Sequence, residues 1–377
     1  MFCLRREFGQ RPMRGLLFLF VMCAAVACTD STAPVDTPDT RWALALANRT
    51  VPDQSIRVSS TISSYTSDTS PDAGINVTRA ATGTYSVLFT RLAARTGWKQ
   101  SVAVSAVGSD PRRCRVVSTE NQGENLVVEV RCHDFAGALA DSYFNILVAT
   151  PGLLTGRAAF AISSLSPGDS VPSATAYNSS GKKITVARMP DTQTGLYTVT
   201  FEGLSRGTGT TTDKEIFHVT AYGDGSHWCK VVGWGVSEQN VTNLELYVGC
   251  FTAAGDPVDG QFSVLMLNRE RAGGRRLGFV WAHNPSAAAS TPHPNWNYNS
   301  TNAVNTAERS AVGVYTISWV GLQRGPTSTA ETSLVTAFGQ DPSYCQVETS
   351  LPSATKFRCF ATNGALVNAR FLAIWIE

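Results

Sequence analysis

Six cysteines in three equivalent pairs are the residues whose type and spacing best predict a chemical role. In each of three repeated blocks, the first cysteine lies six residues after the glycine of a V-[S/T]-A-x-G segment, and a second cysteine follows. Turn-forming residues lie midway between the two, so we expect the thiols at opposed positions of an antiparallel hairpin, close enough to form a disulfide. The pairs are Cys114 and Cys132, Cys229 and Cys250, and Cys345 and Cys359.

Two alternatives to this set of disulfides remain open. Six cysteines permit fifteen connectivities, and pairing within a block follows only if each repeat folds by itself. Zinc ligation is the second alternative, but the sequence has no C-x-x-C spacing, and among the histidines only His133 neighbours a cysteine. We therefore predict three structural disulfides, no metal ion and no cofactor.

The sequence carries none of the common catalytic signatures. It has no G-x-S-x-G nucleophile elbow, no H-E-x-x-H metal motif and no phosphate-binding glycine loop. An acidic position shared by the repeats holds Asp141, Asp259 and Asn368. An amide cannot perform acid–base catalysis, so we expect a turn hydrogen bond there. The sequence favours a protein that is not an enzyme, and an enzyme with an unrecognised site is an alternative.

The third repeat differs from the other two in a stretch rich in aromatic residues. Aromatic rings exposed on a β surface can stack on sugar rings or fill a pocket of a partner. The alternative is structural packing, in which Trp281 begins a strand at the position that Phe160 holds in the second repeat. The candidate ligand contacts are Trp281, His283, Trp296 and Tyr298.

The repeats themselves predict an all-β protein. Each contains a G-x-Y-x-[V/I]-x-[F/W] segment, in which apolar and polar residues alternate as in a half-buried strand. Each repeat has about seven short segments of this kind, separated by turns, which is typical of an antiparallel β-sandwich of immunoglobulin-like or jelly-roll topology. A period of about 115 residues suits a domain. The predicted repeats span residues 42–150, 157–268 and 277–377.

Residues 1–27 have the pattern of a secretory signal peptide. An apolar run from Gly15 to Ala27 follows Arg14 and is too short to span a bilayer comfortably. Met13 directly precedes this complete short signal, which makes it a candidate for the true start of translation.

The end of this signal, A25-V-A-C28, resembles the lipobox of bacterial lipoproteins. The resemblance implies that Cys28 becomes the new N-terminus and carries lipid, which anchors the protein to a bilayer. Residues 28–41 are polar and contain proline, so we expect a disordered tether. The expected location is the bacterial cell envelope.

The charge of the chain argues against a nucleic-acid partner. The sequence has 31 basic and 29 acidic residues, and the signal peptide accounts for four of the first and one of the second. The mature protein is therefore close to neutral, whereas a nucleic-acid-binding surface is usually basic.

The repeats resemble the disulfide-bearing tandem β modules of uncharacterised exported bacterial proteins. This resemblance covers residues 42–377 and implies no particular activity. We expect a surface-anchored binding module, whose partners are the lipid bilayer and an unidentified protein or glycan. The alternative is a passive structural spacer in the envelope.

Overall fold

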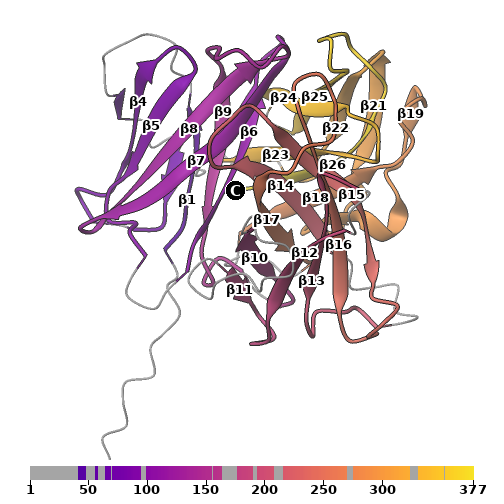
Figure 1. Ribbon diagram of the computed structural model, residues 1–377, viewed down its shortest axis with the longest axis horizontal. Coiled ribbons are helices and arrows are strands. Elements are labelled where there is room, and N and C mark those ends of the chain that lie inside the picture. The colour runs from indigo at the N-terminus through magenta and orange to yellow at the C-terminus, as the bar shows by residue number, and fades with distance from the viewer. Residues whose placement is uncertain are drawn as a thin grey trace, which may run out of the picture. The chain divides into compact units, whose positions relative to one another are not determined.

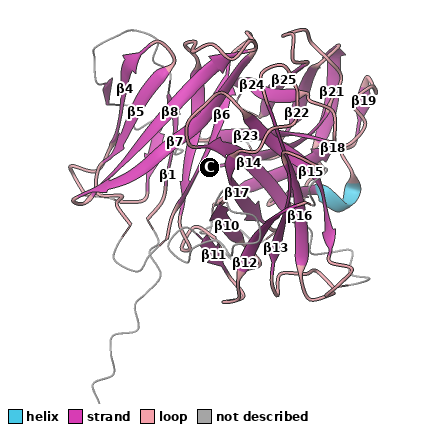
Figure 2. Ribbon diagram, viewed as in Figure 1, coloured by secondary structure: helices cyan, strands magenta, loops and turns pink. Residues whose placement is uncertain are grey.

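The described part of the chain is all-β. The computed structural model describes residues 41–47, 56–57, 64–68, 70–94, 99–154, 156–163, 176–189, 193–207, 215–269, 275–322, 330–351 and 353–377. The predicted signal peptide, Cys28 and the predicted tether up to residue 40 lie outside these residues. Pro38–Glu377 form one compact unit, and its described residues contain strands and one short 3-10 helix (Figure 2).

The strands follow the order of the three repeats. The first repeat contains β1 (Ala43–Ala47), β2 (Ile56–Arg57), β3 (Ser64–Thr66), β4 (Ile75–Ala81), β5 (Thr84–Phe89), β6 (Ser101–Val107), β7 (Arg112–Gln122), β8 (Asn125–Asp134) and β9 (Tyr143–Ala149). The second contains β10 (Ala159–Ile162), β11 (Ala176–Asn178), β12 (Ile184–Arg188), β13 (Leu196–Phe201), β14 (Ile216–Tyr222), β15 (Trp228–Val236), β16 (Leu244–Phe251) and β17 (Gln261–Leu267). The third contains β18 (Leu277–Ala282), β19 (Ala289–Ser290), η3 (Pro294–Trp296), β20 (Asn297–Asn299), β21 (Thr306–Ala311), β22 (Val314–Ser318), β23 (Thr332–Phe338), β24 (Tyr344–Leu351), β25 (Ala354–Phe360) and β26 (Arg370–Ile376).

The predicted alternation of apolar and polar residues is confirmed in β5 and in β13, its equivalent in the second repeat. In β5, Tyr85, Val87 and Phe89 are buried while the residues between them are half-buried, and β13 shows the same pattern. One face of each strand lies on an apolar core, which is why the apolar residues recur with period two.

Each repeat contributes two sheet segments that face each other as in a sandwich, but the sheets do not stop at the repeat boundaries. One nine-stranded sheet joins β7-β8-β5-β4-β2 of the first repeat to β14-β17-β10-β11 of the second. An eight-stranded sheet joins β15-β16-β13-β12 to β23-β26-β18-β20, and another nine-stranded sheet joins β24-β25-β22-β21-β19 to β6-β9-β1-β3 (Figure 1). Each repeat is thus linked to both others.

Three short parallel pairings make these links, and we call them the first, second and third joints. The first pairs β7 with β14, the second pairs β15 with β23, and the third pairs β24 with β6. In each, the amide of the glycine after one strand donates to a valine carbonyl of the neighbouring repeat, at 2.9–3.0 Å. Since the third joint returns to the first repeat, the three repeats form a closed ring.

The last strand of each repeat explains how the ring is held together. The runs NILVA in β9, SVLML in β17 and LAIWI in β26 are buried at every position. Strands covered on both faces have continuous apolar runs instead of alternating ones. One face lies in the repeat's own sandwich, and the other contributes Leu147, Leu265 and Ile374 to a core shared by all three repeats.

The strands of the three repeats fall within the predicted ranges 42–150, 157–268 and 277–377. The predicted ranges do not include the continuation of each sheet from one repeat into the next. That each repeat folds by itself stays a prediction.

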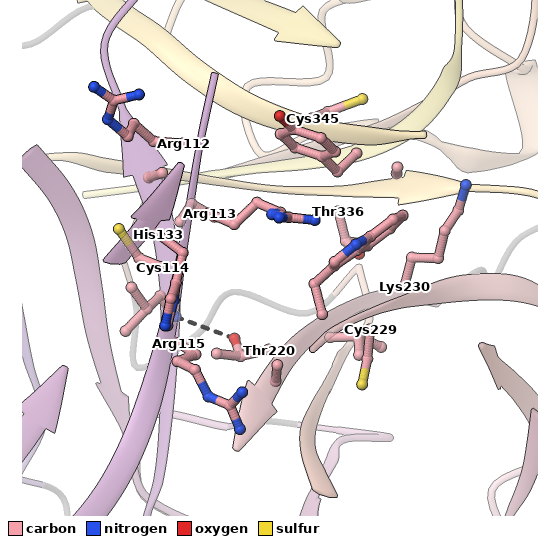
Figure 3. Close-up of a pocket in the computed structure, with 18 of the residues that line it drawn as sticks. Arg112, Arg113, Cys114, Arg115, His133, Thr220, Cys229, Lys230, Thr336 and Cys345 are labelled. Carbon is pink, nitrogen blue, oxygen red and sulfur yellow. Dashed lines mark hydrogen bonds between the residues drawn. The ribbon is translucent and has the colours of Figure 1, made fainter. Parts of the chain in front are cut away.

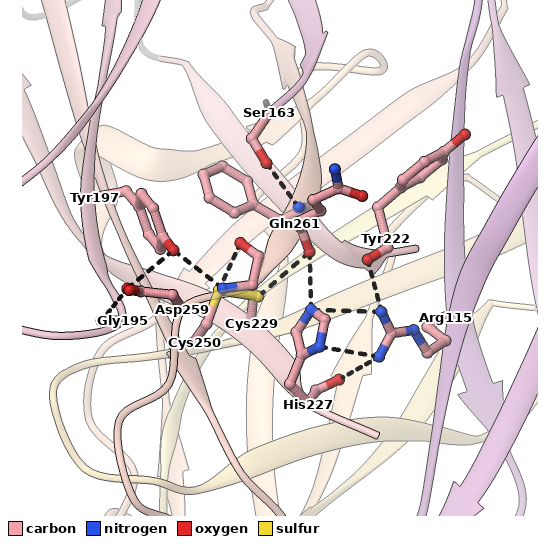
Figure 4. The surroundings of a disulfide bond; sticks show 12 residues. Arg115, Ser163, Gly195, Tyr197, Tyr222, His227, Cys229, Cys250, Asp259 and Gln261 are labelled. Atoms are coloured by element: carbon pink, nitrogen blue, oxygen red, sulfur yellow. Dashed lines mark hydrogen bonds between the residues drawn. A yellow bond between two sulfur atoms is a disulfide. The ribbon is translucent and has the colours of Figure 1, made fainter. Parts of the chain in front are cut away.

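All three predicted disulfides are confirmed. Cys114–Cys132, Cys229–Cys250 and Cys345–Cys359 are bonded, and each pair lies directly opposed in the antiparallel pairing of adjacent strands. The surroundings of the second disulfide are drawn in Figure 4.

The shared acidic position accepts hydrogen bonds from the glycine and the tyrosine at the start of the repeated strand segment. Asp259 accepts hydrogen bonds from the amide of Gly195 at 2.9 Å and from the hydroxyl of Tyr197 at 3.2 Å (Figure 4). Asn368 accepts the same two bonds in the third repeat through its amide oxygen. Gly195 has φ +74°, and a Cβ there would lie 2.7 Å from the carbonyl of Cys250, so only glycine fits. The position is structural.

Candidate functional site

Three of the four predicted ligand contacts lie together in one aromatic cluster. Trp281 lies in β18, His283 follows that strand, and Trp296 ends η3. The ring centroids of Trp281 and Trp296 are 5.3 Å apart, and those of Trp281 and His283 are 5.8 Å apart. His293 stacks on Trp281 at 5.0 Å and precedes η3.

Tyr298, the fourth predicted contact, packs on the ring that precedes Trp281 by two residues in β18. It lies in β20, and its ring packs on Phe279 at 5.2 Å. Tyr177 packs on Phe160 in the same way in the second repeat. The pairings of β18 with β20 and of β10 with β11 therefore place Phe279, and not Trp281, at the position of Phe160.

Two further rings of the cluster come from the second joint. Trp234 of β15 lies 5.6 Å from Trp281 and 5.5 Å from Trp296, and Phe338 of β23 lies 5.1 Å from Trp281. Neither Trp234 nor Phe338 is among the ligand contacts predicted from the sequence. No local signal could reveal them, since it is the joint between repeats that brings them to Trp281.

A buried ionic group adjoins these rings. The side chain of Glu215 is fully buried, pairs with Arg206 and lies 3.7 Å from Arg157. Trp234 donates its indole N–H to Glu215 at 3.0 Å, and Arg206 lies over the ring of Trp296 at 5.7 Å. Burial raises the pKa of the Glu215 carboxyl, and the two arginines oppose that shift. The group fixes Trp234 and Trp296 in place.

The aromatic cluster is partly exposed. The rings of Trp234, Trp281, Trp296 and Phe338 are half-buried, with one side of the cluster packed on the shared core. Among the described residues, no group of three or more His, Cys, Asp or Glu side chains is placed to hold a metal ion.

A second candidate site lies where the three repeats meet. A cavity of about 60 Å³ is lined by residues of all three repeats (Figure 3). The residue before the first cysteine reaches it from each repeat: Arg113, Trp228 and Tyr344. The guanidinium carbon of Arg113 lies 5.0 Å from the ring centre of Tyr344 and 5.8 Å from that of Trp228. The first repeat thus places a cation where the others place rings.

The residue after the first cysteine forms a clasp at each joint. Lys230 donates to the carbonyls of Asp341 and Ser343 in the third repeat, at 2.6 and 3.1 Å. Gln346 donates to two carbonyls of the first repeat, and Arg115 donates to the carbonyl of Tyr222 in the second at 2.6 Å (Figure 4). These three buried side chains hold neighbouring repeats together.

No family model, curated protein or solved structure matches this chain. Among the described residues, no helix is long and apolar enough to cross a membrane.

Proposed function

We propose that this protein is a non-catalytic binding protein of the bacterial envelope, anchored by lipid on Cys28, and that it binds glycan through the aromatic cluster. The lipobox resemblance and the disulfides support export, because disulfides persist in oxidising compartments. The anchor and the binding surface are separate parts of the proposal, and each has its own test.

The observation that carries the binding function is the set of half-buried rings at the second joint. Trp234, Trp281, Trp296 and Phe338 present aromatic surface beside two histidines and Arg206. Sugar rings have flat apolar faces that stack on indole, and their hydroxyls accept bonds from cationic and imidazole donors. The ion pair of Arg206 and Glu215 holds part of this surface rigid, which limits the entropy lost on binding.

A glycan array tests the binding function. The full-length chain in detergent should bind a subset of envelope polysaccharides, and Trp296→Ala should weaken that binding at least about fivefold, since one stacked ring contributes about 1–3 kcal/mol. Tyr143→Ala is a matched control, because Tyr143 is an exposed aromatic residue of the first repeat. Equal affinity in both variants, or no glycan bound, would argue against the proposal.

The anchor is tested by metabolic labelling with a radioactive fatty acid. The wild-type chain should incorporate label and fractionate with membranes, and Cys28→Ser should do neither. Label retained in Cys28→Ser would show that the lipid is elsewhere. This result is independent of the glycan array.

A further inference from the structure

The described residues that line the central cavity include four cations and no acid. The cations are Arg112, Arg113, Arg115 and Lys230. Its volume of about 60 Å³ exceeds what a single water molecule needs. The question is what neutralises the charge there.

Arg113 is a buried cation with two nitrogens that lack an acceptor among the described residues. It is 7% exposed, and one of its terminal nitrogens, Nη2, donates to the carbonyls of Asp134 and Phe135 at 3.0 Å. Its Nε and Nη1 have no acceptor among the described residues. A buried charge is normally paired with an opposite charge, because leaving it unpaired is costly. The adjoining rings of Trp228 and Tyr344 stabilise the cation but accept no ordinary hydrogen bond.

Two more buried donors lie on the same cavity. The indole N–H of Trp228 and the hydroxyl of Tyr344 have no partner among the described residues, and these side chains are 6% and 4% exposed. Buried polar atoms without partners are rare in folded proteins, and each calls for an explanation. Here the unpartnered donors belong to three residues that occupy one equivalent position in the three repeats and contact one another.

The other cations of the cavity differ in how they are neutralised. Arg112 lies 3.5 Å from Asp110, and Lys230 lies 3.6 Å from Asp341. Arg115 is 2% exposed and is held by carbonyls and by His227, with its Nε unpartnered among the described residues. Figure 3 shows Arg113 and Arg115 extending from the same strand. Among the described residues, neither guanidinium group has a carboxylate at ion-pair distance, and Asp134 and Asp224 attract Arg113 and Arg115 only from farther away.

We infer that this cavity binds a small inorganic anion, between chloride and sulfate in size. The anion would accept from the unpartnered donors of Arg113, Trp228 and Tyr344 and neutralise the charge of Arg113 and Arg115. Since the site is built from all three repeats, the anion binds only the closed ring. It acts as a structural ligand of that ring.

The test is the thermal unfolding midpoint of the full-length chain at constant ionic strength. In one series chloride replaces gluconate, which is too large for the cavity, and in a second series sulfate does so. A ligand that binds only the folded state raises stability with the logarithm of its concentration. The midpoint should rise by about 2–4 °C for each tenfold increase above the dissociation constant, in at least one series.

Two variants locate the effect. Arg113→Gln should abolish the dependence on anion, and Tyr344→Phe, which deletes one donor with little change of shape, should weaken the affinity about tenfold. Arg358→Gln is the control, because Arg358 pairs with Glu348 outside the cavity and its loss should leave the dependence intact. If Arg113→Gln does not fold, Tyr344→Phe decides alone. The inference is overturned if the wild-type unfolding midpoint depends on neither anion. It is also overturned if both variants keep the wild-type dependence of the midpoint on anion concentration.

Discussion

The second and third joints form the same backbone pairing but carry different side chains. At the second, Trp234, Phe338 and Trp281 meet as a cluster of rings. The register of the third joint puts Ser350, Val107 and Leu46 at the equivalent positions. Both joints nevertheless form the same parallel pairing and the same glycine-to-valine hydrogen bond. The parallel pairing of the third joint therefore forms without aromatic rings.

This difference separates scaffold from binding surface. Positions that the repeats share, such as the disulfides and the glycine before each strand segment, hold the strands of each repeat together. Positions that the repeats do not share carry the aromatic cluster and the cations of the central cavity. The predictions that follow test whether the shared positions contribute equally to stability in all repeats, and whether the positions that differ give each joint its own properties.

The largest expected effect is loss of stability in acid, concentrated at the first joint. Burial lowers the pKa of three histidines there to about 4, from a usual value near 6.5. The unfolded chain binds protons below pH 6.5 and the folded chain does not, so stability is full above pH 6.5 and falls as the pH drops toward 4. Each histidine contributes up to about 1.4 kcal/mol per pH unit in this window. They are His133, His218 and His227.

Urea unfolding at several pH values between 7 and 4 measures this loss. His218→Leu reproduces Leu334, the equivalent residue of the third repeat, and should reduce the pH slope by up to one histidine's share. Hydrogen exchange in acid should deprotect β14 before β23. Simultaneous opening of all joints, or an unchanged slope in His218→Leu, would contradict the assignment.

The next effect concerns the scaffold and should be equal in all repeats. Gly83→Ala, Gly195→Ala and Gly313→Ala each place a Cβ 2.5–2.7 Å from a cysteine carbonyl at positive φ, so each should cost at least about 3 kcal/mol. Gly123→Ala is the control, since Gly123 also has positive φ but has open space around it, and it should cost about 1 kcal/mol. Denaturant unfolding gives the values, and equal costs in test and control would refute the steric argument.

A smaller effect is expected at the clasps. Lys230→Gln copies the clasp residue of the third repeat and should lose less than about 1.5 kcal/mol, because an amide can still donate to the carbonyls of the neighbouring turn. Lys230→Leu leaves those carbonyls without a donor and should lose about 3 kcal/mol. Unfolding midpoints compare the two, and a leucine variant as stable as the glutamine variant would show that the clasp is dispensable.

The smallest effect is expected at the shared acidic position. Asp259→Asn copies Asn368, keeps the acceptor for Gly195 and Tyr197, and loses only the ion pair with Arg188 at 3.0 Å. The loss should stay within about 1 kcal/mol, because that pair is partly exposed. Asp259→Leu removes the acceptor as well, and a loss no greater than in Asp259→Asn would show that the turn bond contributes little.

The scaffold within a repeat could be predicted because its signals are local. Period-two alternation marked β5 and its equivalents, and the cysteine spacing with a turn at its centre marked the disulfides. The ring could not be predicted in this way, because each joint is a single bridged pair of strands far apart in sequence. The one available signal was the unbroken apolar run of β9, β17 and β26, which indicates strands covered on both faces.

The candidate sites were predictable only in part. The aromatic stretch of the third repeat pointed to Trp281 and Trp296, but the cluster also needs Trp234 and Phe338 from the joint. The cavity depends on the difference between Arg113 and its two aromatic counterparts. The sequence alone does not show that these three side chains contact one another, because the closed ring brings them together.

Hydrogen exchange of the full-length chain, with and without the glycan selected on the array, compares the second and third joints as binding surfaces. Glycan should protect β15, β18 and η3, which carry the rings of the second joint, and should leave exchange in β24 and β6 of the third joint unchanged. Equal protection at both joints, or protection confined to the first repeat, would contradict this prediction.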